Sequence, residues 1–405
     1  MNKKVFLFYF LIAFLLKASS QCPTAIIAVE DTVCAQQNLI LQNLSAGGTE
    51  NLWDFCAMDL SKSYVSENSI STGGGSPRGA AFVQSGSDWY GFVTVRNNKN
   101  LLRLSFGSSL SNTPSVVNLG NPGGLFELVD QIELYREGNQ WYGLVVNDQG
   151  SNNLIRLSFG SSLTGTPTAE NLGNFGGKLN RPRGIAIRED DGDVIVGVTN
   201  FGSRTVAMLN FGSSISSALG SITYLESGVI PGDQIIDLEI GKDCDSWYGF
   251  VGSRATVDKV YRLSFGQSLY SVPLIAEVVS FRDAVEDVFE LSLVHDGFDW
   301  RLFGAGQTSD FMRGDFGGDL SSSPAIEPVS LVITGPTSLE FPEGSGVGMI
   351  LDYSTGQLKR LDYGYSCSLS ERYSQEETPL NVNYEVSGWH YITLKVTDAS
   401  SNVAY

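Results

Sequence analysis

The sequence predicts an all-β protein built from six stacked repeats, because one pattern of residues returns along most of the chain. Tryptophans at positions 89, 141, 247 and 300 are separated by one or two lengths of about 53 residues. Each tryptophan strand is followed by a second strand that ends in an aromatic residue and glycine. The aromatic residues of the six pairs are Phe106, Phe159, Phe211, Phe265, Phe316 and Tyr363. A period of this length indicates a repeat architecture.

Each repeat has the composition of four short strands. Segments such as WYGFVTV and NLLRLSFG are rich in aromatic, aliphatic and β-branched residues, and clusters such as NNKN and NLGNPGG separate them. One four-stranded antiparallel sheet cannot bury both of its faces alone, so the copies are expected to stack radially, which leaves only short protected edges. The fold class that follows is a six-bladed β-propeller.

The first 20 residues have the pattern of a secretory signal peptide. They carry two lysines at positions 3 and 4, continue with an apolar run over residues 5–16 that is too short to span a bilayer, and end in small residues. We expect residues 1–20 to be removed and the chain to be secreted, to the extracellular space or the outer cell surface. No later segment is apolar enough for a membrane helix, so no membrane insertion is expected after removal.

The charge balance argues against one class of partner. The chain has 26 Lys and Arg against 44 Asp and Glu, a formal net charge of −18. Such a surface repels the phosphates of nucleic acids and of anionic membranes. We therefore expect an extracellular glycan or protein as the partner, and no nucleic acid.

The cysteines indicate disulfides rather than a metal site. All of them lie in the exported part, and no Cys-x-x-Cys spacing occurs. Their number is odd, so at least one thiol is left over. The five are Cys22, Cys34, Cys56, Cys244 and Cys367.

The segments that flank the repeats resemble the two halves of one polycystic-kidney-disease (PKD) domain, a small immunoglobulin-like sandwich. The motif Trp53, Asp54 and Phe55 matches the first signature of that family. The second signature is matched by Tyr384, Gly388, Tyr391 and the strand ITLKVTD over residues 392–398. Cys56 stands where the family usually has glycine, and the Gly-Asp-Gly turn is missing.

This resemblance implies a sandwich formed by residues 21–57 and 378–405, with the propeller of residues 58–377 inserted into one of its loops. Insertion at an exposed turn is tolerated when the ends of the inserted domain lie close together. With that topology a Cys56–Cys367 bridge and a Cys22–Cys34 bridge are expected. The alternative is a half-domain, a propeller and a second sandwich that continues beyond Tyr405.

The repeats themselves resemble the NHL and TolB-like class of six-bladed propellers. The third repeat carries the best match, with Pro182, Gly184 and an Ile-Ala-Ile strand, and the first repeat keeps Pro77, Arg78 and Gly79. Propellers of this class serve as binding platforms, lactonases and sensor domains, so the fold alone does not select a function.

Histidine chemistry is disfavoured. The chain has two histidines, His295 and His390, and neither has a nucleophile or a metal ligand near it in sequence. A Cys/His metal site and Ser-His-Asp hydrolysis are therefore not expected.

Carboxylates are the remaining candidates for a site. Counting ten positions back from each tryptophan or its equivalent places Asp237 and Glu290 on the innermost strands, at the same level as Gly79, Gln131 and Gly184. Converging carboxylates there could hold calcium through oxygen ligands. We favour solvated strand ends that pair with arginines, and we leave the metal unknown. The binding residues expected at the channel mouth are Arg78, Asp130, Arg183, Asp237 and Glu290.

Two other features have plainer explanations. The acidic turn over residues 189–193 lacks the following Glu of a calcium loop, so a hairpin is expected. Trp89, Trp141 and Trp247 could stack on sugars, but their fixed phase within strands favours packing between blades.

The function expected from these observations is an exported, non-catalytic binding or adhesion protein, with the loop face of the propeller recognising a glycan or protein. The combination of domains resembles surface proteins of gliding Bacteroidetes. No cofactor is expected, and calcium is left open. Two alternatives remain open: a calcium-dependent, lactonase-like hydrolase in the channel, and a structural spacer of a larger surface protein.

Overall fold

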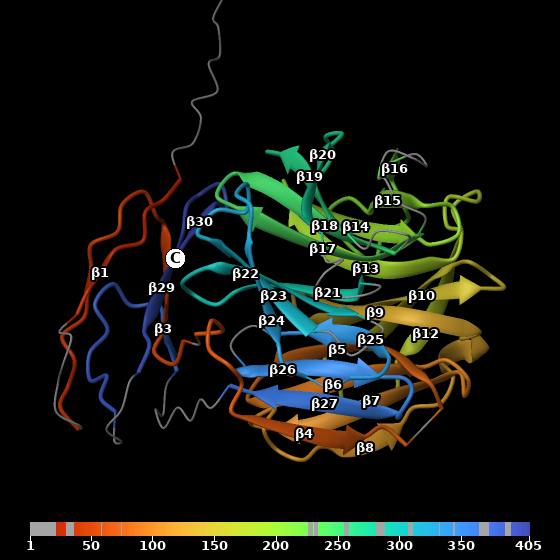
Figure 1. The fold of residues 1–405 in the computed structure, drawn as a ribbon, viewed down its shortest axis with the longest axis horizontal. Coiled ribbons are helices and arrows are strands. Elements are labelled where there is room, and N and C mark those ends of the chain that lie inside the picture. The colour runs from red at the N-terminus through yellow and green to blue at the C-terminus, as the bar shows by residue number, and fades with distance from the viewer. Residues whose placement is uncertain are drawn as a thin grey trace, which may run out of the picture.

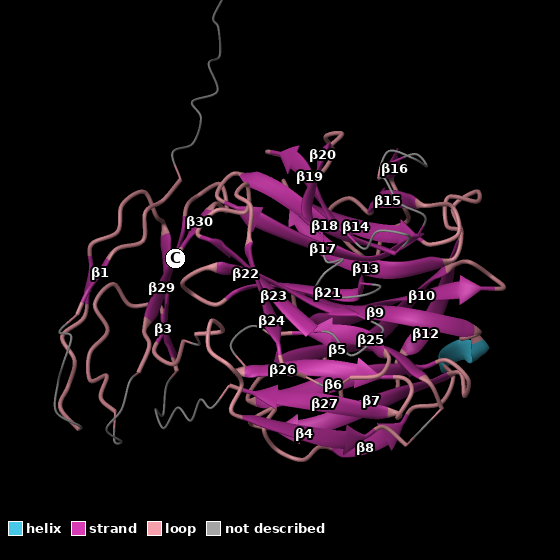
Figure 2. Ribbon diagram, in the orientation of Figure 1, coloured by secondary structure: helices cyan, strands magenta, loops and turns pink. Residues whose placement is uncertain are grey.

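The computed structural model describes most of the chain after the amino-terminal segment. Residues 1–20, Cys34, Cys367 and Gly388 lie outside the described residues, so the expectations for the signal peptide and these side chains remain predictions. Over the described part the chain is all-β, with the 3-10 helix η1 (Pro122–Gly124) as its single helix (Figure 2). The described residues are 22–29, 36–57, 59–73, 75–225, 230, 234–254, 259–280, 288–306, 311–331, 333–342, 345–363, 372–384 and 390–405.

Five four-stranded antiparallel sheets follow one another along the chain, each formed by four consecutive strands. We name each sheet by its first strand. Their strands are β5 (Pro77–Ser85), β6 (Asp88–Val95), β7 (Asn100–Gly107) and β8 (Ser115–Asn118); β9 (Leu128–Glu137), β10 (Gln140–Gln149), β11 (Leu154–Gly160) and β12 (Thr168–Gly173); β13 (Pro182–Asp190), β14 (Asp193–Asn200), β15 (Thr205–Asn210) and β16 (Ser221–Leu225); β17 (Gln234–Asp243), β18 (Ser246–Arg254), β19 (Lys259–Gly266) and β20 (Leu274–Ser280); β21 (Val288–His295), β22 (Trp300–Gly306), β23 (Phe311–Gly317) and β24 (Ala325–Val329).

A further sheet joins the two ends of the repeat region. It consists of β25 (Pro336–Glu340), β26 (Val347–Asp352) and β27 (Gln357–Asp362), with β4 (Ser66–Ser71) as its outer strand. Figure 1 shows β4 beside β27, although β4 precedes β27 by almost 300 residues. The outer strand of the last repeat is therefore supplied from before the first repeat.

The first strands of these sheets form a closed ring. Each contacts the first strand of the next sheet, from β5 through β9, β13, β17 and β21 to β25, and β25 contacts β5. The arrangement is propeller-like, with the first strands nearest the ring axis (Figure 1). Trp89, Trp141 and Trp247 are buried between sheets, which confirms that they pack rather than form a sugar-stacking surface.

The repeated aromatic-glycine pair has a conformational cause. The glycines that end the third strands have a positive φ, for example 69° at Gly107 and 72° at Gly160. Residues with a β-carbon avoid this region, so glycine is required where these described third strands turn away.

A separate four-stranded sheet pairs the two flanking segments. In it β3 (Glu50–Asp54) lies between β28 (Tyr373–Ser374) and β29 (Thr393–Thr397), and β30 (Val403–Ala404) lies beside β29. A two-stranded sheet of β1 (Ile27–Ala28) and β2 (Gln42–Asn43) lies nearby on the left of Figure 1. Trp53 is fully buried in the core of this region, and its indole N–H donates to the Glu376 carbonyl at 2.9 Å.

One predicted disulfide is wrong. Cys22 bonds to Cys244 and not to Cys34. Cys244 lies in the turn between β17 and β18, and β17 is the ring strand that contacts β30 of the flanking sheet. The prediction assigned the amino-terminal arm to the sandwich alone, but the arm is attached to the ring. Cys56 is also disulfide-bonded, while the expected Cys56–Cys367 pair lies outside the described residues.

Arginines on the third strands fasten neighbouring sheets to one another. Each stands three residues before the aromatic residue of its repeat and donates to backbone carbonyls in a loop of the next sheet. Arg262, for example, donates to the Leu320 and Ser322 carbonyls at 2.8 and 2.7 Å. We call these residues the junction arginines. They are Arg103, Arg156, Arg262, Arg313 and Arg360.

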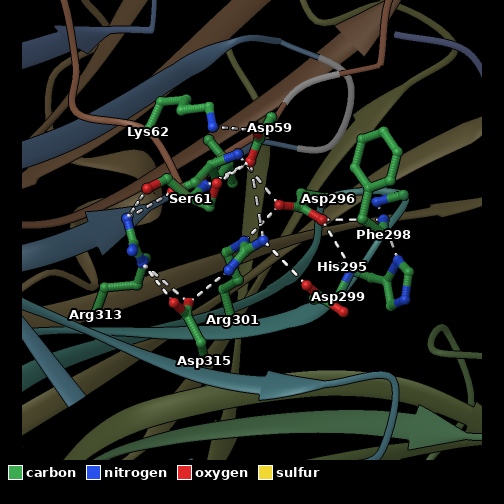
Figure 3. A network of polar contacts seen from close by, with 12 residues as sticks. Asp59, Ser61, Lys62, His295, Asp296, Phe298, Asp299, Arg301, Arg313 and Asp315 are labelled. Atoms are coloured by element: carbon green, nitrogen blue, oxygen red, sulfur yellow. Dashed lines mark hydrogen bonds and ion pairs between the residues drawn. The ribbon is translucent and has the colours of Figure 1, made fainter. Parts of the chain in front are cut away.

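Backbone amides of the same loops donate hydrogen bonds to aspartates at the ends of the first strands. Figure 3 shows one such junction, where Arg313 donates to the Leu60 and Ser61 carbonyls and Asp296 accepts from the Leu60 amide at 3.1 Å. At the junction between the β13 and β17 sheets the arginine position holds Met208. There Asp190 accepts from the Leu269 amide and the Trp247 indole, at 2.8 and 2.9 Å.

We expect Arg360→Ala to lower the free energy of unfolding by about 2 kcal/mol, because it removes two charge-assisted hydrogen bonds, one to the buried Leu110 carbonyl and one to the part-buried Asn112 carbonyl. Urea denaturation of the mature protein measures the loss. Arg136→Ala is the control, since Arg136 is exposed and donates within its own hairpin. Equal losses in the two variants would contradict a role for Arg360 in holding sheets together.

Candidate functional site

Two hollows lie along the first strands at the ring axis. The arginine-lined hollow, about 180 Å³, lies where the first strands begin, and Arg78, Arg183, Arg254, Thr337 and Tyr353 line it together with Gly335 and Pro336. The carboxylate-lined hollow, about 190 Å³, lies further along the same strands. Its acidic side chains are Glu133, Asp237, Glu239, Glu290 and Glu340, with Arg188 among them.

The five residues predicted for the channel mouth are divided between these hollows. Arg78 and Arg183 line the first, and Asp237 and Glu290 line the second. Asp130 lines neither, because its side chain is buried in ion pairs.

The prediction missed several lining residues. Glu133 and Glu239 stand two positions after Gln131 and Asp237, so the period of two in a β-strand could have identified them. Arg254 and Tyr353 come from the ends of second strands. Closure of the ring brings these two side chains beside Arg78 in the arginine-lined hollow.

Glycines set the spacing of the ring at two junctions. A β-carbon on Gly79 would lie 2.6 Å from Cα of Gln131, and one on Gly184 would lie 2.7 Å from Cα of Asp237. Any larger residue would push the first strands apart. The Pro-Arg-Gly motif therefore places Arg78 and Arg183 directly beside a close strand contact.

Arginines outnumber their acidic partners at the first hollow. Asp148 accepts from Arg96, Arg181 and Arg183 at 2.6, 3.1 and 3.3 Å. Asp130 pairs with Arg96 at 2.9 Å and with Arg183 at 3.8 Å. Burial alone would raise the pKa of Asp148, but Arg183 and Arg96 hold it below its usual range. The carboxylates of Asp130 and Asp148 thus pair with three guanidinium groups.

Arg78 stands apart from these pairs. Among the described residues it has no hydrogen-bond or ion-pair partner, and its buried Nε–H is unsatisfied. Its guanidinium lies 5.0 Å from the centre of the Tyr353 ring. Burial lowers the pKa of Arg78 below its usual range; Arg96 and Arg183 add to the effect, and Asp130 and Glu290 oppose it.

In the second hollow the acidic side chains join neighbouring first strands. Asp237 accepts from the Leu291 amide at 2.8 Å, and Glu340 accepts from the Phe82 amide at 3.0 Å. The Gln131 amide nitrogen donates to Glu290 at 2.6 Å and to the Thr337 carbonyl at 2.8 Å, so it lies between the two hollows. These bonds satisfy the strand edges that face the axis.

Five carboxyl groups around one arginine are electrostatically unfavourable. Arg188 lies 3.7 Å from Glu133 and 3.9 Å from Glu239. Burial raises the pKa of Glu133 to about 7, with Arg188 opposing it, and burial raises the pKa of Asp237 to about 6.

The other three carboxyl groups follow the same trend. Burial, and then the charges of neighbouring carboxylates, hold the pKa values of Glu239, Glu290 and Glu340 well above their usual range. The Glu133 side chain keeps 32% of its surface exposed in the hollow, so it can meet a ligand.

The histidines have structural roles in the described part of the chain. His295 stacks on Tyr405 with ring centres 3.6 Å apart, and burial lowers its pKa to about 3. His390 stacks on Tyr384 at 3.8 Å. No group of three or more His, Cys, Asp or Glu side chains is placed to hold a metal ion within the described residues.

The fold and the two hollows define an all-β, propeller-like protein with a polar site on its ring axis. No family model matches the sequence, and no curated protein matches it. No helix within the described ranges is long and apolar enough to cross a membrane.

Solved structures share the fold at low identity. An auxiliary nutrient binding protein from Bacteroides thetaiotaomicron is 10% identical with a TM-score of 0.50, over 80% of this chain and 83% of that chain. A mutant of AofleA from Arthrobotrys oligospora is 9% identical with a TM-score of 0.51, over 81% and 92%. These values show the fold alone.

The prediction that this protein is not an enzyme is corrected. Similar structures include an α-L-arabinofuranosidase from Clostridium thermocellum, which is 12% identical with a TM-score of 0.44, over 65% of this chain and 96% of that chain. A hydrazine synthase from Kuenenia stuttgartiensis is also among them. The prediction relied on a missing acid, base and nucleophile set. Spacing placed Asp237 and Glu290 on the innermost strands, but it did not show that Glu133, Glu239 and Glu340 join them in one hollow.

The raised pKa values predict that the fold loses stability as the pH rises. In the unfolded chain Asp and Glu ionise near pH 4, whereas in the fold Asp237 and Glu133 ionise near pH 6 and 7. Their contribution is complete below about pH 4 and is lost as the pH rises through 6 and 7. We expect the melting temperature to be roughly 5 °C higher at pH 5 than at pH 8.

Glu133→Gln should reduce this pH dependence, because it removes one of the crowded charges. Glu50→Gln serves as the control, since Glu50 is exposed in the flanking sheet. Thermal melts across pH 5 to 8 compare the two variants. If both changed the slope equally, the effect would reflect net charge and not the hollow.

Proposed function

We propose that this chain is an exported carbohydrate-binding protein that takes its ligand at the ring axis. The proposal includes the finer architecture: a six-bladed propeller of the NHL or TolB-like class, inserted into a PKD-like sandwich and displayed at the cell surface. The ring of sheets and the sheet shared by both flanking segments support this architecture. The disulfide between Cys22 and Cys244 supports an oxidising location.

The observation that carries the proposal is the carboxylate-lined hollow. Acidic side chains from four first strands converge on about 190 Å³, and few apolar atoms face it. A hollow of this size has room for about six waters at roughly 30 Å³ each. One sugar ring displaces a comparable number.

The chemistry of the lining fits a polyhydroxyl ligand. Ionised carboxylates accept hydrogen bonds from sugar hydroxyl groups, and protonated carboxyl groups and Arg188 donate to sugar oxygens. Charged partners form the stronger hydrogen bonds. The similar structure from Bacteroides thetaiotaomicron is that of a nutrient binding protein, which is compatible with this ligand class.

Hydrolysis of a glycosidic bond in the same hollow is a second candidate function. It is favoured by Glu133, whose pKa near 7 lets it hold a proton in the hollow that Asp237, with a pKa near 6, also lines. Glycosidases combine a protonated carboxylic acid with a carboxylate in this way. The calcium-dependent lactonase and the structural spacer remain as weaker alternatives.

The test is a glycan array followed by calorimetry on the mature protein. We expect a saccharide ligand, and a roughly tenfold weaker affinity in both Glu133→Ala and Glu239→Ala, because each loses a hydrogen bond to the ligand. Glu50→Ala is the control. Cleavage of the bound saccharide, measured by product analysis, would select the hydrolase.

A failure to bind any saccharide would overturn the proposal. Because removal of Glu133 is expected to relieve charge crowding, its variant should remain folded. Lost binding in that variant would then report on the site.

A further inference from the structure

The arginine-lined hollow has a cationic lining that the proposed binding at the carboxylate-lined hollow does not explain. It lies at the other part of the axis, where β5, β13 and β25 begin and β18 and β26 end. Its lining is cationic in a chain whose net charge is −18. The clustering of arginine side chains in a protein of negative net charge requires a local explanation.

The internal charge balance leaves this hollow positive. Asp130 and Asp148 are occupied by Arg96, Arg181 and Arg183, as the distances above show. Arg78 adds a further guanidinium group to the same mouth, and Arg254 also lines it. No acidic side chain is among the described residues that line this hollow.

Arg78 is the strongest single indication of a missing partner. Its Nε–H is buried and has no acceptor among the described residues, a condition that it shares with Arg183 and with the junction arginines Arg103, Arg262 and Arg360. Unlike those four, Arg78 makes no hydrogen bond or ion pair through its other nitrogens within the described residues. A buried N–H group without an acceptor is destabilising. An anion in the hollow would satisfy Arg78 and Arg183 at once, and arginine offers planar, two-pronged hydrogen bonding to carboxylate or sulfate.

The wall beside Arg78 also fits a sugar ring. Tyr353 is 36% exposed, and the Arg78 guanidinium lies over its ring. Its backbone amide donates to the Gly335 carbonyl at 2.9 Å, which fixes the ring at the mouth. An aromatic side chain of this kind combines an apolar face with a polar tip, so it can contact the C–H face of a saccharide while arginines bind its acidic group.

We infer that the arginine-lined hollow is an anion site that binds the carboxylate or sulfate group of an acidic glycan. The inference rests on the proposed function and names the ligand class of the same ring axis. At about 180 Å³ the hollow accommodates one anionic group with part of its sugar ring. The local cations act at short range, because charges elsewhere on the protein are screened beyond about 8 Å at physiological salt.

The experiment compares oligogalacturonate, a sulfated galactan oligosaccharide, a neutral galactan oligosaccharide and inorganic sulfate by calorimetry. We expect at least one acidic saccharide to bind roughly tenfold or more tightly than the neutral one, and to weaken as NaCl is raised. Binding of the two saccharide classes distinguishes a carboxylate from a sulfate ligand. Tight binding of inorganic sulfate with no preference for an acidic saccharide would overturn the glycan part of the inference.

Arg78→Met is the decisive variant, because it removes the guanidinium without breaking an ion pair. We expect the affinity for the acidic saccharide to fall roughly ten- to a hundredfold, with an unchanged or higher melting temperature in the absence of ligand. Arg136→Met, at an exposed site, is the control. An acidic saccharide that binds Arg78→Met as tightly as wild type would overturn the inference.

The results also separate the inference from the proposed function. If neutral and acidic saccharides bind equally and Arg78→Met has no effect, carbohydrate binding stands and the anion site fails. If no saccharide binds at all, the proposed function and the inference both fail.

Discussion

The polar backbone groups at the junctions between sheets are the constraint on which the ring depends. Each four-stranded sheet buries its faces against two neighbours, and so it also buries loop carbonyls and the edge of its first strand. Buried polar groups without partners are costly. The junction arginines satisfy the loop carbonyls, and Asp190, Asp243 and Asp296 satisfy loop amides.

The same requirement at the inner edge determines the character of the axis. Where glycine brings two first strands together, a second-strand threonine makes the connection: Thr94 accepts from the Gly79 amide and donates to the Asp130 carbonyl. Elsewhere the acceptors are Asp237, Ser292, Ser338 and Glu340. The axis is consequently polar, and its carboxyl groups are close enough to raise one another's pKa values. The side chains that satisfy the strand edges thus give the axis its polar, ionisable lining.

The two ends of the chain are held at the side of the ring. Residues 50–54 and 393–397 pair in one sheet, β4 completes the sheet of β27, and Cys22 bonds to Cys244. Each of these three contacts joins residues more than 200 positions apart. Opening the ring would therefore require several distant contacts to break together.

The sequence by itself determined the repeat length, the all-β class, the packing role of the tryptophans and the glycines of the aromatic-glycine pairs, because these depend on local composition and periodicity. The sequence also places each junction arginine three residues before the aromatic residue of its repeat. The prediction did not use this signal. The tertiary structure alone decided that Cys22 meets Cys244, that Arg254 and Tyr353 reach the mouth beside Arg78, and that the predicted site separates into a cationic and an acidic hollow. These features arise from ring closure, which sets side chains from different sheets face to face at distances that spacing along one chain does not encode.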